Sequence, residues 1–522
     1  MAAAGVGVLT ALALAGKAAA QTADPLLNAL IKKGILSEDE AKSIKAEADA
    51  SQSNNIPPEA SWNKWTIHNA IKNVELFGDI RLRYEGRHAD GPGPDAVRVQ
   101  LERSRYALRV GLRGEALDDF YYGIRLETAS NPRSPWVTFG QTTSGTGPFS
   151  KSAGTINLGQ IYLGWRPEEW VDITVGKMPN PLYTTSMVWD PDINPEGAAE
   201  HLKYKVGEAD LFANFGQFLY QDLNPSYASG GLGFNNLVGQ TTDEIFQIAW
   251  QAGVNYHITT NTSAKIAGTL YKYIGMKSST LASGSSTSPY FGDNFVGEGA
   301  YAGAGSFSPI NGASGSGPVI VIPGFQSTGF ANNQVGLNHL LVVDVPFEVN
   351  FKISKLQAKI FGDGAYNLEG KQRAQDAATG YAAYLASGST PAGISPFKAQ
   401  TQEVKAYQIG FALSNDRDIG LLNGSVLRKH AWEVRAFWQH VEQYALDPNL
   451  LDSDFFEGRG NLQGFFTAAA FAFSDNVMGT VRYGHANRIN DAIGTGGSNQ
   501  DIPQVNPIQE YDIFQADLTF KF

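Results

Sequence analysis

The sequence of 522 residues predicts an all-β protein, a transmembrane antiparallel β-barrel of about sixteen strands. Three observations lead to this prediction. Apolar and polar residues alternate over stretches of ~10 residues, which is long enough for a tilted strand to cross a membrane. The connections between these stretches alternate between short and long, as they do in membrane barrels. The number of stretches is even, so both chain ends are expected on the same side of the membrane.

The composition excludes several classes of protein. The chain has no cysteine, which rules out disulfides and cysteine-ligated zinc. It is acidic, with 40 Lys and Arg against 51 Asp and Glu, and it has no run of basic residues. Nucleic acid is therefore not expected as a partner. The 57 glycines, 21 tyrosines and 29 phenylalanines favour strands and turns over helices.

Residues 1–20 are expected to form a signal peptide for export. An apolar stretch precedes the small-residue pattern "AAA", which favours cleavage after Ala20. Lys17 is the only charged residue here, although signal peptides usually begin with a basic residue. A membrane anchor and a mis-assigned start codon are the alternatives. No later run approaches the ~18 apolar residues that a membrane helix needs.

Residues 21–60 are expected to form a periplasmic helical segment followed by a linker. Asp24, which precedes a proline, can cap a first helix, and Ser37 with Glu40 forms the capping box of a second. The two helices are expected to pack on the barrel or on each other. A contact with peptidoglycan or with a sister subunit through residues 24–50 is the alternative.

The barrel is expected to occupy residues 61–522, because the period changes to two from Val74 onward. In "VELFGDIRLRY" the even positions carry most of the apolar residues, and the odd positions carry the charged ones. Strands of water-soluble sandwiches are usually ~5–6 residues long, so the length of these stretches favours a membrane barrel. The predicted strands are 74–85, 98–115, 119–129, 155–166, 169–177, 198–206, 208–219, 243–258, 262–275, 334–346, 354–367, 402–415, 430–445, 460–474, 477–488 and 510–522.

The connections give the orientation of the predicted barrel. Those after odd-numbered strands are mostly long, and those after even-numbered strands are mostly tight, as in "EALDD" and "RPEEW". The stretch "NDRDIGLLNGSVLRK" is an exception. Short turns belong to the periplasmic side, so the first strand runs outward and the last strand closes against it. The residues expected in outward aromatic girdles are Trp432, Trp438, Trp165 and Tyr106.

Three stretches resemble a known family. They are "LLNALIKKGILSEDEAKSIKAEA", "LFGDIRLRYEG" and, most specifically, "VGKMPNPLYTTSMVWDPDINPEGAA" at residues 175–199. With these stretches the chain resembles the putative porins of Gram-negative bacteria, although Leu182 stands where an aromatic residue is common. The resemblance implies an outer-membrane diffusion channel and, by analogy with general porins, a homotrimer. It does not identify a transported solute.

The candidate functional residues are charged side chains expected to line the pore. In general porins of sixteen strands, the loop after strand five folds into the lumen, and residues 178–197 take that place here. Acids of this loop would face a basic wall on strands one to three, and the resulting field would set ion selectivity. The alternative is that these charges only pair with neighbours. The predicted pore-lining residues are Arg81, Arg83, Arg105, Arg109, Arg113, Arg125, Asp190, Asp192 and Glu196.

The expected function is a passive, water-filled porin for small hydrophilic solutes and ions, without catalysis, cofactor or metal. The eight histidines show no ligand spacing, and the sequence contains neither H-E-x-x-H nor a Walker A motif. The expected partners are lipid of the outer membrane and the transported solutes. The alternatives are a substrate-selective channel for phosphate or sugar and a structural barrel that anchors the envelope.

Overall fold

The computed structural model describes residues 68, 70–93, 96, 98–129, 134–140, 155–221, 245–274, 339–374, 403–417, 419–491, 495, 501–502, 505 and 507–522. The expected signal peptide, helical pair and linker lie outside these residues and stay predictions. Among the described residues, no helix has the length and apolar character needed to cross a membrane.

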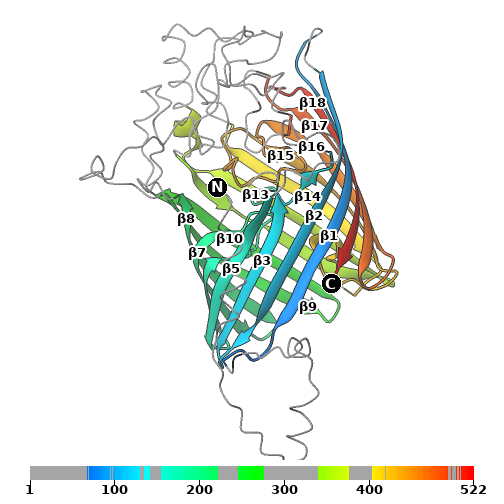
Figure 1. The fold of residues 1–522 in the computed structure, drawn as a ribbon. Helices are drawn as coiled ribbons and strands as arrows, with labels where there is room; N and C mark the ends of the chain where they lie inside the picture. Colours follow the sequence, from blue (N-terminus) through cyan, green and yellow to red (C-terminus); the bar gives the residue numbers. More distant parts are fainter. Residues whose placement is uncertain are drawn as a thin grey trace, which may run out of the picture. The chain divides into compact units, whose positions relative to one another are not determined.

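The described strands form one antiparallel sheet whose first and last strands pair, so the sheet is a closed barrel (Figure 1). The strand segments are β1 (Glu75–Asp90), β2 (Arg98–Ala116), β3 (Phe120–Ala129), β4 (Val137–Thr138), β5 (Thr155–Glu168), β6 (Val171–Lys177), β7 (Glu196–Val206), β8 (Ala209–Gln221), β9 (Ile245–Thr259), β10 (Thr262–Ile274), β11 (Leu341–Asp344), β12 (Phe347–Ile353), β13 (Leu356–Asn367), β14 (Lys405–Ser414), β15 (Trp432–Val441), β16 (Leu462–Ala472), β17 (Val477–Arg488) and β18 (Glu510–Lys521).

These eighteen segments make sixteen barrel strands in the described part of the chain, as predicted. The short β4 pairs with β2 beyond the end of the β2–β3 pairing. Both β11 and β12 pair with β10 and with β13, so they are two halves of one strand. The break between the halves contains Pro346, which has no N–H to donate to the neighbouring strand.

The seam between β1 and β18 closes the barrel. Their register runs from Asp79–Lys521 to Asp90–Glu510. Beyond it, the N–H of Gly78 donates to the carbonyl of Phe522 (2.9 Å), and the N–H of Phe522 donates back (3.1 Å). The prediction that the last strand pairs with the first is confirmed, and no unpaired strand edge remains at this seam.

Most predicted strands differ from the observed ones by only a few residues at either end, but two differ for physical reasons. The tenth was predicted at 334–346, whereas the described strand lies at 341–353, because it continues past Pro346 instead of ending there. β1 extends to Asp90, beyond its predicted end at residue 85, because the polar inward side chains near its end find partners inside the barrel.

The outward face of the barrel is apolar, as the alternation predicts. Leu82, Phe520 and the girdle residues Trp165 and Trp438 are each more than 40% exposed. The exceptional long connection between β14 and β15 contains a short 3-10 helix, η6 (Leu421–Asn423). Its Leu421 is buried in a small apolar cluster with residues of β16 and β17.

Candidate permeation site inside the barrel

The connection between β6 and β7, residues 178–195, lies inside the barrel and is called here the first inward segment. The Thr185 hydroxyl donates to Asp363 on β13 (2.6 Å). Asp192 accepts a hydrogen bond from Arg109 on β2 (2.5 Å). Since β2 and β13 lie in opposite directions along the sheet from β6, the segment contacts two separate parts of the wall.

Two glycines allow this segment to leave the wall. Gly176 and Gly197 are register partners at the ends of β6 and β7, with φ of 123° and 151°. A Cβ at Gly176 would lie 2.3 Å from the Ile161 carbonyl oxygen, and one at Gly197 would lie 2.1 Å from that of Gln217. Only glycine satisfies both the conformation and the space. The prolines of the segment then prevent it from continuing the ladder.

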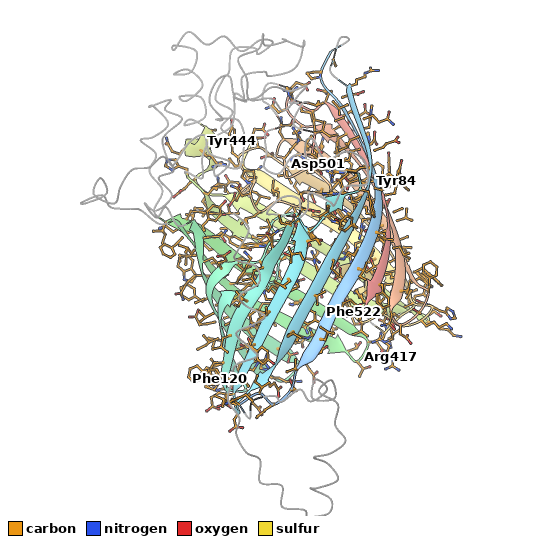
Figure 2. All side chains as sticks on the ribbon, viewed as in Figure 1. Tyr84, Phe120, Arg417, Tyr444, Asp501 and Phe522 are labelled. Carbon is orange, nitrogen blue, oxygen red and sulfur yellow. The ribbon has the colours of Figure 1, made fainter. Side chains whose placement is uncertain are left out.

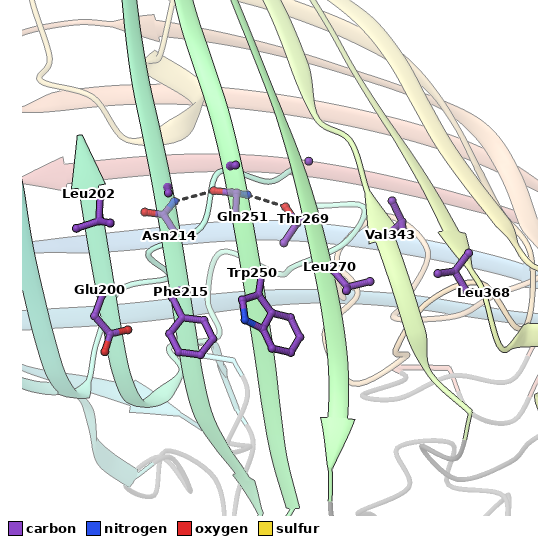
Figure 3. A pocket seen from close by; sticks show the side chains of 13 residues that line it. Glu200, Leu202, Asn214, Phe215, Trp250, Gln251, Thr269, Leu270, Val343 and Leu368 are labelled. Carbon is purple, nitrogen blue, oxygen red and sulfur yellow. Dashed lines mark hydrogen bonds between the residues drawn. The ribbon is translucent and has the colours of Figure 1, made fainter. Parts of the chain in front are cut away.

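A side-chain amide on β9 holds the first inward segment by its backbone. Gln251 accepts a hydrogen bond from the N–H of Tyr183 (2.9 Å) and donates one to its carbonyl (2.8 Å). The same amide accepts from Asn214 and donates to Thr269, each at 2.7 Å. Figure 3 shows these three polar residues in a row on one face of the sheet, with Trp250 on the other face.

We expect Gln251→Leu to release the segment, because Leu keeps the volume but loses all four hydrogen bonds of the amide. The open-channel current in a planar bilayer should become noisier as the segment moves. Gln408→Leu is the matched control, because Gln408 is also buried on a strand but bonds to Gln439 on the neighbouring strand. Equal noise in the two variants would contradict the role given to Gln251.

The connection between β15 and β16, residues 442–461, also lies inside the barrel and is called here the second inward segment. Most of its residues are buried, and it contacts the first inward segment directly. The N–H of Asp190 donates to the Leu450 carbonyl (2.6 Å). The N–H and hydroxyl of Ser453 donate to the Asp190 carboxyl (3.3 and 3.2 Å). The sequence analysis did not predict this second segment.

Apolar side chains fill the space between the inward segments and the wall. Members of this cluster are Met187, Val188, Trp189, Phe218, Leu450, Leu451, Phe455, Phe456, Ile502, Ile508 and Ile513. A third connection, that between β17 and β18, supplies Ile502 and Ile508 and is fixed by Arg459. The buried Arg459 guanidinium donates to the carbonyls of Ile502 (2.7 Å) and Val505 (3.0 Å). The described part of the interior is therefore partly packed.

A charged cluster surrounds Glu85 at the inner side of the β1–β18 seam. Glu85 is fully buried and pairs with Arg103 (2.5 Å) and Arg87 (3.1 Å). Arg83 and Arg105 also approach it, each at 3.7 Å. The remaining acids of the cluster come from distant parts of the chain and are Asp454, Glu457, Asp501 and Asp517. Figure 2 places Asp501 and Tyr444 toward one end of the barrel, and Phe120 and Arg417 toward the other.

Most of the predicted arginines pair with carboxylates of the wall. Arg83 forms two hydrogen bonds with Asp517 (2.8 and 3.0 Å). Among the described residues, Arg105 has no carboxylate closer than that of Glu85 (3.7 Å). It lies 5.9 Å from the ring of Trp136, over which Arg83 stacks at 4.0 Å. The other pairs are Arg81–Asp79 (2.6 Å), Arg125–Glu127 (3.1 Å) and Arg113–Glu75 (2.7 Å).

The three predicted acids do not act together. Asp192 faces the basic wall through Arg109, which also approaches Glu127 (3.3 Å). Asp190 instead contacts the second inward segment, and the half-exposed Glu196 pairs with Lys177 (2.5 Å). The structure therefore brings together one acid–arginine pair between the first inward segment and the basic wall.

The two aspartates of the first inward segment differ in their electrostatics. Burial raises the pKa of Asp190, and the nearby carboxylates of Asp452 and Asp192 raise it further. Burial acts in the same direction at Asp192, but the Arg109 guanidinium outweighs it and holds the pKa of Asp192 below its usual value. Burial and neighbouring carboxylates therefore destabilise the charged form of Asp190, whereas the Arg109 guanidinium stabilises the charged form of Asp192.

Comparison with known proteins gives a family and several solved structures. A family model described as "Putative porin" matches residues 94–522. No curated protein matches the chain. A loop L8 deletion mutant of OmpT, an outer membrane protein of Vibrio cholerae, is 9% identical, with 86% of this chain and 99% of that chain covered and a TM-score of 0.34. Salmonella typhi OmpF in complex with daunomycin is 9% identical (87% and 99% covered, TM-score 0.37). The outer membrane channel DcaP of Acinetobacter baumannii is 12% identical (88% and 99% covered, TM-score 0.36).

Proposed function

The chain belongs to the putative porin family, and we propose that it forms a passive channel for small hydrophilic solutes and ions in the outer membrane of a Gram-negative bacterium. The observation that carries the proposal is the position of the first inward segment, which reaches the basic wall of β1–β3 through Asp192 and Arg109. A path beside this pair would be lined by charges of both signs, which select hydrated solutes by charge and size.

The predicted pore residues have different roles in the proposed channel. Arg81, Arg109, Arg125 and Asp192 line the narrowest part of the path. Arg83, Arg105 and Asp190 support the wall and the inward segments. Arg113 and Glu196, whose side chains are about half exposed, lie away from it. A polar cavity of about 440 Å³ at the end of the barrel that carries Arg417 supports a wet mouth there, since charged residues such as Glu348, Lys352 and Arg417 line it.

The test is a single-channel recording of the purified barrel in a planar bilayer under a KCl gradient. We expect stepwise conductance. Arg109→Gln should shift the reversal potential toward cation selectivity, because Asp192 and Glu127 lose their counter-charge. Arg113→Gln is the matched control, because its pair with Glu75 is half exposed, and it should leave the reversal potential close to wild type.

Other outcomes would replace the proposal with its alternatives. Saturable block of the current by phosphate or by a sugar would identify a substrate-selective channel. A folded barrel that never opens would favour a structural barrel. An unchanged reversal potential in Arg109→Gln would remove the Asp192–Arg109 pair from the conducting path.

We also propose that the barrel forms a homotrimer through the outward face of β7–β10. This face has a hollow of about 630 Å³, because its outward positions carry the small residues Ala213, Ala252 and Gly268. The outward Glu200, bonded to Gln217 (3.2 Å), borders the hollow. An ionisable group facing lipid is costly, and a sister barrel would cover it.

We expect Gly268→Phe to prevent assembly without unfolding the barrel. A Cβ at Gly268 meets no atom within 4 Å, so the ring would enter the hollow rather than the wall. Light scattering in detergent should show a trimer for the wild type and a monomer for Gly268→Phe. Gly86→Phe is the control, because its Cβ is equally free on the opposite part of the wall, and it should stay trimeric. A monomeric wild type would contradict the proposal.

A further inference from the structure

Two buried aspartates lie beneath the first inward segment, on the wall away from the arginines. Asp344 ends β11 and is fully buried, and Asp363 lies on β13 with 2% exposure. In the described part of the chain neither carboxylate forms an ion pair. Two lysines of the neighbouring strands have other partners, since Lys359 pairs with Glu348 (3.0 Å) and Lys265 lies over the ring of Tyr183 (3.8 Å).

The aspartates are surrounded by further oxygen atoms. The hydroxyl of Thr184 approaches Asp344 (3.4 Å), and that of Thr185 donates to Asp363 (2.6 Å). The hydroxyl of Tyr271, a buried residue of β10, has no hydrogen-bond partner among the described residues. The same holds for the second carboxylate oxygen, Oδ1, of each aspartate.

Such an arrangement lacks a positive charge. Burying two adjacent carboxylates without a counter-charge costs several kcal/mol each, so a proton or a cation must compensate them. A shared proton would still leave one negative charge buried on the pair. A divalent cation would balance both carboxylates.

We propose that Asp344 and Asp363 bind one Ca²⁺ ion through their unpartnered oxygens, with the hydroxyls of Thr184, Thr185 and Tyr271 as further oxygen ligands or near neighbours. The donor set contains only oxygen, which suits a hard cation and not zinc. Ca²⁺ accepts irregular sets of six to eight oxygens, with water completing the shell, whereas Mg²⁺ demands near-ideal octahedral geometry. The ion would fasten the first inward segment to β11 and β13, whatever solute the channel conducts.

The test is calorimetric titration of CaCl₂ into the full-length barrel, in detergent, after EDTA has been removed by dialysis. We expect one ion per chain in the wild type and at least a ten-fold loss of affinity in Asp344→Asn/Asp363→Asn. Added Ca²⁺ should also raise the temperature at which the wild-type barrel loses its heat-modifiable gel mobility. If the double variant does not fold, each single Asn variant is titrated in its place.

The control is Asp512→Asn, which alters the other candidate metal cluster of the described residues, the outward His485, Glu510 and Asp512. This variant should bind Ca²⁺ as the wild type does. The proposal is overturned if the wild type binds no Ca²⁺, or if binding survives in the Asp344 and Asp363 variants and is lost in Asp512→Asn. Either result would mean that a shared proton, and not a metal ion, compensates the buried pair of aspartates.

Discussion

Replacement of Glu85 by alanine is expected to lower the free energy of unfolding by about 3–5 kcal/mol, the cost of removing one partner from a buried ion pair. Glu85 is fully buried and contacts Arg87 and Arg103 directly. Without it, four guanidinium groups crowd the inner side of the seam, and burial prevents water from screening their repulsion. The loss should appear as a lower urea midpoint for the folded barrel in detergent.

Glu75→Ala on the same strand is the matched control. Glu75 also pairs with an arginine, Arg113, but both side chains are more than half exposed. Water screens an exposed pair, so this variant should unfold near the wild-type midpoint. If the two variants lose equal stability, the cluster around Glu85 does not hold the seam.

Phe455→Ala is expected to raise the single-channel conductance and to destabilise the barrel by about 3–5 kcal/mol. The Phe455 ring is 1% exposed and packs on Phe456 (4.3 Å between ring centres) and Phe466 (5.1 Å). Its removal leaves a cavity within the apolar cluster that narrows the lumen. Water can enter such a space only where polar groups border it, and the nearby acids of the second inward segment provide them.

Phe520→Ala serves as the control for this substitution. Phe520 is the same residue type on the lipid-facing side, with 43% exposure. Its loss should leave the conductance at the wild-type value, because no atom is removed from the interior. An unchanged conductance in Phe455→Ala would mean that the apolar cluster lies outside the conducting path.

The strands could be predicted because every second side chain of a membrane-spanning strand faces lipid and is therefore apolar. A pleated strand places successive side chains on opposite faces, so Leu82 and Phe520 reveal their orientation without knowledge of any neighbour. The alternation of long and short connections then predicted that the last strand pairs with the first. The tenth strand was misplaced because a proline indicates a break in a strand, and the sequence does not show that pairing resumes beyond it.

The contents of the barrel could be predicted only in part. Inward parity predicted that the arginines of β1–β3 line the pore, and the rule for the loop after strand five predicted that residues 178–197 fold inward. Their partners depend on contacts between residues hundreds of positions apart, such as Arg83 with Asp454, and no local pattern encodes these. The adjacent aromatic residues Phe455 and Phe456, in a connection between two predicted strands, are a local signal for the second inward segment.

The seam couples the closure of the barrel to the packing of its interior. Arg83 of the first strand pairs with Asp517 of the last strand and also with Asp454 of the second inward segment. These three residues meet only when the two strands are paired and the segment lies inside the barrel. A closed barrel without the segment inside would keep the pair between Arg83 and Asp517 but would leave Arg83 without Asp454. Closure of the seam and packing of the interior therefore stabilise each other.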